Sequence, residues 1–122
     1  MEYVEEFELN GKNFVCVDFS GLETDRSYIE RVEQTVPAVV KYPESSVYLV
    51  ANLENVRFDS NTKKITADYI MRVRPYLKHA AVFGADGIKK LMILTAMKLG
   101  GKINAHFTFT KEEAIEWLLS QK

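Results

Sequence analysis

Residues 47–70 decide the fold, and they read VYLVANLENVRFDSNTKKITADYI. Five consecutive apolar residues, 47–51, predict a strand that is covered on both faces and therefore lies inside a sheet. A short polar loop follows, and a helical pattern begins directly behind Asp59 and Ser60. This arrangement leaves free backbone N–H groups at the carboxyl end of a sheet, where open α/β proteins bind their ligands. We therefore predict that a functional site lies at this edge.

The composition of the 122-residue chain is that of an ordinary globular protein, with 47% apolar and 27% charged residues. This length predicts one domain over residues 1–122. The net charge of −1 argues against a dedicated nucleic-acid binder. No apolar run approaches the roughly 20 residues that cross a bilayer, so we expect no membrane insertion. The lone Cys16 and an acidic start unlike a signal peptide favour a cytoplasmic location.

A hairpin is predicted ahead of the central strand. Strand candidates 3–9 and 13–19 are joined by Asn10-Gly11, which suits a type I′ turn because both central residues need positive φ. The first strand is rich in glutamate, so we expect one of its sides to face water. Such a strand would form a sheet edge that could pair with a second copy of the chain, which leaves a homodimer as an open alternative.

A helix is predicted on each side of the central strand. The first begins near Thr24 or Asp25, both plausible N-cap residues, and Pro37 should kink or interrupt it because proline lacks a backbone donor. The second begins behind the polar loop and ends near Pro75, since the residue before a proline disfavours helix.

The last third of the chain repeats a strand-helix unit. Residues 79–84 form a short strand that ends in a glycine-containing turn, and a helix over 88–99 follows. Residues 104–109 alternate as in a strand with its phenylalanines on one side, and Thr110 opens the final helix with a capping-box sequence. The predicted inward face of helix 88–99 carries Ile88, Leu91, Met92, Thr95 and Leu99.

The predicted order of elements is ββαβαβαβα, an α/β fold with a single mixed sheet of about five strands and helices packed on it. This order resembles the STAS domains of anti-sigma-factor antagonists, and in particular the stand-alone bacterial SpoIIAA-like proteins. So does the motif of an apolar strand, a short loop, an Asp-Ser pair and a helix. The resemblance is carried by VYLVANLENVRFDS (47–60), KHAAVFGADGIKKLM (78–92) and HFTFTKEEAIEWL (106–118).

The resemblance implies a regulatory or binding role without a catalytic centre. In the antagonists, a partner kinase phosphorylates the serine of the Asp-Ser pair, and this controls binding to that kinase. Ser60 occupies the matching position here, behind Asp59. Asn61 and Thr62 replace the family's next small residue and glycine, which would let a partner backbone approach closely. The fold also resembles lipid-carrier domains, which implies an apolar ligand as an alternative.

The candidate binding surface joins two loops, from Asn52 to Asn61 and from Gly84 to Gly87. Both follow neighbouring parallel strands, so we expect them to meet at one edge of the sheet. There the protein would bind a protein partner or a small ligand, with phosphorylation at Ser60 as a means of control. The predicted contact residues are Asn52, Glu54, Asn55, Arg57, Asp59, Ser60, Gly84, Asp86 and Gly87.

Each of these residues also has a purely structural interpretation. Asp59 and Ser60 are favoured N-cap residues, and a cap stabilises a helix by about 1 kcal/mol without any further function. The glycine turn is neither a Walker loop nor a complete G-x-G-x-x-G motif, so it fits a plain turn. Arg57 could form a surface ion pair with Glu54 or Asp59, or bind an anionic group of a partner.

No pattern in the chain indicates an enzyme, a metal site or a cofactor. H-x-x-H, C-x-x-C, H-E-x-x-H and G-x-S-x-G are all missing from the sequence. His79 and His106 are far apart along the chain, and Cys16 fits an inert core thiol. The alternative function is a carrier of an apolar or lipid-like molecule held between sheet and helices. Its candidate contacts are Phe14, Phe83, Met92 and Met97.

Overall fold

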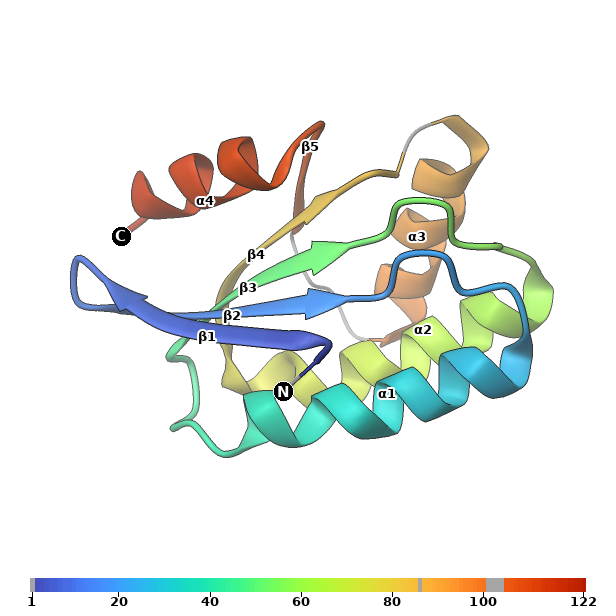
Figure 1. The fold of residues 1–122 in the computed structure, drawn as a ribbon, viewed down its shortest axis with the longest axis horizontal. Coiled ribbons are helices and arrows are strands. Elements are labelled where there is room, and N and C mark those ends of the chain that lie inside the picture. Colours follow the sequence, from blue (N-terminus) through green and yellow to red (C-terminus); the bar gives the residue numbers. More distant parts are fainter. Residues whose placement is uncertain (1, 86, 101–104) are drawn as a thin grey trace.

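The computed structural model of the protein describes residues 2–85, 87–100 and 105–122. Their strands form one sheet in the order β1-β2-β3-β4-β5, with β1 antiparallel to β2 and all other neighbours parallel (Figure 1). The mixed five-stranded sheet of the prediction is therefore confirmed. The strands are β1 Val4–Leu9, β2 Lys12–Asp18, β3 Val47–Asn52, β4 Leu77–Phe83 and β5 Ala105–Thr108.

Three helices cover one face of the sheet and a fourth covers part of the other face (Figure 1). Successive parallel strands are neighbours, so their right-handed crossovers all bring the connecting helix to the same face. No helix among the described residues is long and apolar enough to cross a membrane. The helices are α1 Asp25–Val40, α2 Ser60–Val73, α3 Gly87–Gly100 and α4 Lys111–Leu119, with a 3₁₀ turn, Arg74–Tyr76, behind α2.

Side chains that alternate along the strands divide the core into two layers. Val15, Val17 and Leu49 point toward α1, α2 and α3, whereas Phe14 and Tyr48 point toward α4. The first five residues of β3 are all buried, because this strand contributes to both layers. The apolar run at 47–51 therefore marks a central strand, as predicted.

Capping boxes begin three of the helices. Thr24 caps α1, Asp59 caps α2 and Thr110 caps α4. In each box the cap side chain accepts a hydrogen bond from the backbone N–H three residues later, and that later side chain accepts one from the cap backbone. Each cap satisfies N–H groups that the helix leaves without a partner.

The predicted interruption of the first helix at Pro37 is wrong, since α1 continues from Asp25 to Val40. Pro37 lies on the exposed side of the helix. Its ring leaves the carbonyl of Glu33 without the usual donor, and Glu33 is exposed as well, so water can satisfy that carbonyl. The cost of the proline is small enough for the packing of α1 to outweigh it.

The predicted inward face of the third helix is also wrong. Ile93, Ala96 and Met97 are buried, whereas Leu91 and Leu99 are 65% and 58% exposed. Thr95 is exposed too, Met92 is partly buried, and the side chain of Ile88 is not described. The start of the predicted strand 104–109, residue 104, also lies outside the described residues. Relative to the predicted orientation, α3 is therefore rotated about its own axis, and the side that carries Ile93, Ala96 and Met97 faces the protein interior beside α2.

Gly100 explains this rotation, because it lets the end of α3 touch the α2 backbone. A Cβ atom at Gly100 would lie 2.8 Å from the carbonyl oxygen of Ala67 and 2.8 Å from Cβ of Ile70. Both distances are too short for a real contact. Any larger residue would separate the two helices, so a leucine-lined face cannot take this place.

We predict that Gly100→Ala destabilises the protein, although alanine favours helix over glycine by about 1 kcal/mol. Overpacking against a fixed backbone costs about 1–3 kcal/mol, which exceeds that gain. Urea unfolding measures the change, and exposed Lys98→Ala is the control, with a shift within about 0.5 kcal/mol. A more stable Gly100→Ala protein would contradict the contact between α3 and α2.

Candidate functional site

Three turns meet at the edge of the sheet where the parallel strands end. The backbone N–H of Gly21, between β2 and α1, donates to the carbonyl of Glu54 at 2.9 Å, and the N–H of Arg57 donates to Leu22 at 2.9 Å. The N–H of Leu53 donates to the carbonyl of Phe83 at 2.9 Å. The loop behind β3 is thereby fastened to the turns on both sides.

The two predicted loops lie side by side, and Gly84 makes this approach close. Gly84 has φ +84°, and a Cβ atom there would lie 2.3 Å from Cγ of Glu54 and 2.7 Å from its backbone nitrogen. Asn52 shapes the same loop, since its side-chain oxygen accepts a hydrogen bond from the Glu54 N–H at 2.9 Å. Asn55 then turns the chain with φ +58°. A side chain at position 84 would push these loops apart.

Two adjoining hollows lie over these turns, and we call them together the rim groove. They measure about 300 Å³ and about 570 Å³, and they share Asn55 and Lys89. The smaller hollow is lined by Glu54, Asn55, Gly84, Ala85, Lys89, Thr108 and Phe109. The larger hollow is lined by Glu23, Asn55, Val56, Arg57, Phe58, Lys89 and Met92.

Phe109 is the most exposed large apolar residue of the rim groove, whereas the sequence analysis placed it in a strand, on the same side as Phe107. Its side chain is 85% exposed. Phe109 directly precedes the cap Thr110, a position at which an apolar residue usually packs on the fourth helical residue. Here that residue is Ala114, which is short and fully buried against the sheet. The pairing of phenylalanine with alanine at this spacing was the signal that Phe109 points outward.

Arg57 and Asp59 form the charged end of the groove. Arg57 bonds Asp25, and its Nε lies 3.1 Å from Oδ2 of Asp59. Asp59 also accepts hydrogen bonds from the N–H groups of Asn61 and Thr62, both at 3.0 Å. The bond from Thr62 contributes most to a lowered pKa of Asp59, and Arg57 adds to it. Asp59 is therefore ionised and occupied as a helix cap.

Ser60 is the first residue of α2 and lies beside the groove rather than in its lining. Its side chain is exposed and makes no hydrogen bond to the described part of the chain. Thr62, at the position that the resemblance matches with a glycine, is 1% exposed, and its hydroxyl accepts a hydrogen bond from the Asp59 N–H at 2.7 Å. This threonine completes the capping box. Asp86 lies outside the described residues, and Gly87 begins α3 without lining the groove.

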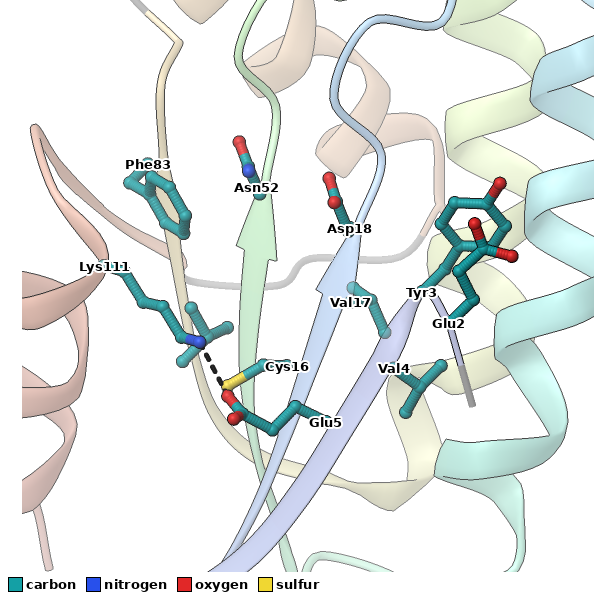
Figure 2. A pocket seen from close by; sticks show the side chains of 11 residues that line it. Glu2, Tyr3, Val4, Glu5, Cys16, Val17, Asp18, Asn52, Phe83 and Lys111 are labelled. Atoms are coloured by element: carbon teal, nitrogen blue, oxygen red, sulfur yellow. Dashed lines mark hydrogen bonds and ion pairs between the residues drawn. The ribbon is translucent and has the colours of Figure 1, made fainter.

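A further hollow of about 420 Å³ lies on the α4 side of the sheet (Figure 2). Lys111 and Glu5 form an ion pair of 2.6 Å beside Cys16. Burial raises the pKa of Cys16 to about 11, so this thiol is protonated and unreactive at neutral pH. Asn52 lines this hollow and not the rim groove.

His79 and His106, distant in sequence, both contact Trp117 of α4. The ring of His106 stacks on Trp117 at 4.4 Å, and His79 meets it edge-on at 6.2 Å. Within the described ranges, no three histidine, cysteine, aspartate or glutamate side chains are grouped to hold a metal ion. The contacts of these two histidines with Trp117 pack α4 against the sheet.

The residues predicted for an apolar carrier do not line one cavity. Phe14 and Phe83 belong to the layer under α4, Met97 belongs to the opposite layer, and Met92 lines the rim groove. The apolar hollow between sheet and helices measures about 50 Å³ in the described part of the protein. Ligand pockets usually measure about 300 Å³ or more, so this geometry does not favour a lipid-like cargo.

Comparisons with known proteins support the fold. No protein-family profile and no curated protein sequence match the chain. Its structure is similar to that of an anti-sigma-factor antagonist (STAS) domain protein from Planctomyces limnophilus, with a TM-score of 0.51 and 13% identity. The match covers 96% of this chain and 98% of the other. At this identity the match shows the fold, and it confirms the STAS-like architecture of the prediction.

We predict that Asp59→Ala lowers stability at neutral pH and that the loss shrinks in acid. The folded-state pKa of Asp59 lies below 3.8, so its contribution is present above that pH and fades as the pH falls through the lower folded value. Urea unfolding at pH values from neutral to acid measures the difference in the free energy of unfolding between the two proteins. Asp59→Asn, which keeps a capping oxygen but carries no charge, is the control. An equal loss at all pH values would refute the charge effect.

Proposed function

We propose that the protein is a non-enzymatic binding module that engages a protein partner through the rim groove. The exposed Phe109 beside a hollow is the observation that carries this proposal. Aromatic side chains next to pockets supply much of the binding energy in protein interfaces. The STAS-like architecture agrees with such a role.

The groove has the composition of a protein interface rather than of a catalytic centre. Its lining contains apolar Phe109 and Met92 together with charged Glu54, Arg57 and Lys89. An apolar centre with a polar border is typical of surfaces that bind other proteins. The pKa shift of Asp59, which borders the groove, is explained by its capping role, so no acid-base function is needed to account for it.

Phosphorylation of Ser60 would change the charge of this surface without unfolding it. A phosphate adds about −1.5 to −2 charges, and a helix N-terminus tolerates them. Lys64 lies one turn further along α2 on the same side as Ser60 and can pair with the phosphate. The carboxylate of Asp59 would repel the phosphate, and the guanidinium of Arg57 would be attracted to both the phosphate and Asp59. The charged end of the groove would thus be rearranged by the modification.

We predict that a photo-crosslinking residue at position 89, which lines both hollows, captures the partner in cells that naturally make the protein. Phe109→Ala should reduce that adduct, because loss of an interface hot spot of about 2 kcal/mol weakens binding roughly 30-fold. Met71→Ala is the matched control, since Met71 is 56% exposed near the far end of α2. Equal adducts in all three proteins would reject Phe109 as the anchor.

The phosphorylation hypothesis has its own test. Ser60→Ala should change stability by no more than about 0.5 kcal/mol, since Asp59 and not Ser60 is the cap. Ser60→Asp, which adds a charge, and Ser60→Ala, which prevents phosphorylation, should give different yields of the position-89 adduct. If the two variants give the same adduct yield as the unmodified chain, control through Ser60 is refuted and binding through Phe109 still stands.

A further inference from the structure

The outer edge of β1 carries unpaired backbone groups in a fixed pattern. β1 pairs with β2 alone, around the two-residue turn that Asn10 and Gly11 form with φ +53° and +75°. The pair Leu9–Lys12 closes this turn, and the N–H of Asp18 donates to Tyr3 at 3.0 Å. Antiparallel ladders alternate, so the backbone groups of residues 3, 5, 7 and 9 face β2.

The backbone N–H and C=O groups of Val4, Glu6 and Glu8 consequently point away from the sheet. No backbone hydrogen bond from the described residues reaches them. They recur every two residues, or about 6.8 Å, which is the repeat that an added strand requires. The strand is also held in place, because the Arg31 guanidinium lies 3.5 Å from the ring centroid of Tyr3. This edge is a preformed template for an extended chain.

The same edge is acidic. Glu5, Glu6 and Glu8 make up half of the six residues of β1. Lys111 of α4 reaches Glu5 at 2.6 Å, and Lys41 at the end of α1 reaches Glu6 at 2.8 Å, so these two carboxylates are paired from opposite faces of the sheet. Glu8 has no ion pair with any described residue. A strand added beside β1 would therefore carry its side chains next to those of three glutamates, of which Glu8 has no cation of its own among the described residues.

These carboxylates disfavour a second copy of the chain as the occupant. A two-fold antiparallel pairing centred on Glu6 places it against Glu6 of the other copy. If the two-fold centre lies at residue 5 instead, Glu5 is opposite Glu5 of the other copy. If it lies at residue 7, Glu6 is opposite Glu8. Like charges directly opposite are destabilising, whereas lysine or arginine opposite glutamate is favourable. Pairing of β1 with β1 of a second copy is therefore disfavoured, and pairing with a strand that carries lysine or arginine is favoured.

We propose that the β1 edge binds an extended, lysine- or arginine-bearing segment of another protein by adding it as a sixth strand. This surface is separate from the rim groove and does not depend on the function proposed for it. Glu8, which has no ion pair with a described residue, is the carboxylate that would pair with a lysine or arginine opposite it on that strand.

The test uses the full chain and the peptide acetyl-Lys-Val-Lys-Val-Lys-Val-Lys-amide. We expect the peptide to slow amide hydrogen exchange of Val4, Glu6 and Glu8 at least roughly tenfold, because these groups gain partners. The amides of residues 5, 7 and 9 are already paired and should change little. A peptide of the same sequence with N-methylated valines, and one with glutamate in place of lysine, should give no protection.

Two variants separate backbone pairing from charge. Glu8→Pro removes an outward N–H but no bond to β2, and proline is tolerated on such an edge, so the hairpin should persist while peptide protection is lost. Glu8→Gln keeps the N–H and should weaken binding only several-fold. Thermal unfolding checks that both variants remain folded. Equal binding of the N-methylated peptide would overturn the proposal, as would protection of Val4, Glu6 and Glu8 that rises with protein concentration alone.

Discussion

The handedness of the parallel crossovers is the constraint on which the structure depends. Each strand after β2 lies next to its predecessor, so every connecting helix passes over the same face. That face receives α1, α2 and α3, and the opposite face is left to α4, which packs mainly on β3, β4 and β5. The open hollow beside β1 results from this unequal covering.

The same constraint brings the functional candidates together. Because β2, β3 and β4 run in parallel, the turns that follow them all emerge at one edge. Gly84 can then approach Glu54 closely enough to exclude any side chain at its own position. Three loops that are separate in the sequence therefore share hydrogen bonds, and their side chains form one continuous surface.

Signals confined to a few consecutive residues made the fold predictable. The apolar run at 47–51, the Asn10-Gly11 turn and the cap at Thr110 each depend on local chemistry, and the structure confirms all three. The rotation of α3 was not predictable in this way. It depends on contact between Gly100 and Ala67, which are distant along the chain.

The candidate site was predictable only in part, for the same reason. Its two predicted loops follow from strand order, so their meeting could be anticipated. The contribution of the turn before α1 required knowledge that β2 lies beside β3. The exposure of Phe109 depends on the small size of Ala114 and on the seating of α4. These features depend on contacts between elements that are distant in the sequence, and local propensity and periodicity do not predict such contacts.

The position of α4 has a consequence for how the protein forms during synthesis. Strands β2, β3 and β4 can pair in the order in which they leave the ribosome, since each needs only its predecessor. Phe14, Tyr48 and Val50, however, are covered by Ala114 and Leu118 of α4, which follows all five strands in the sequence. An apolar sheet surface therefore stays uncovered until α4 has been synthesised. The nascent chain is most prone to aggregation, and most in need of a chaperone, in that interval.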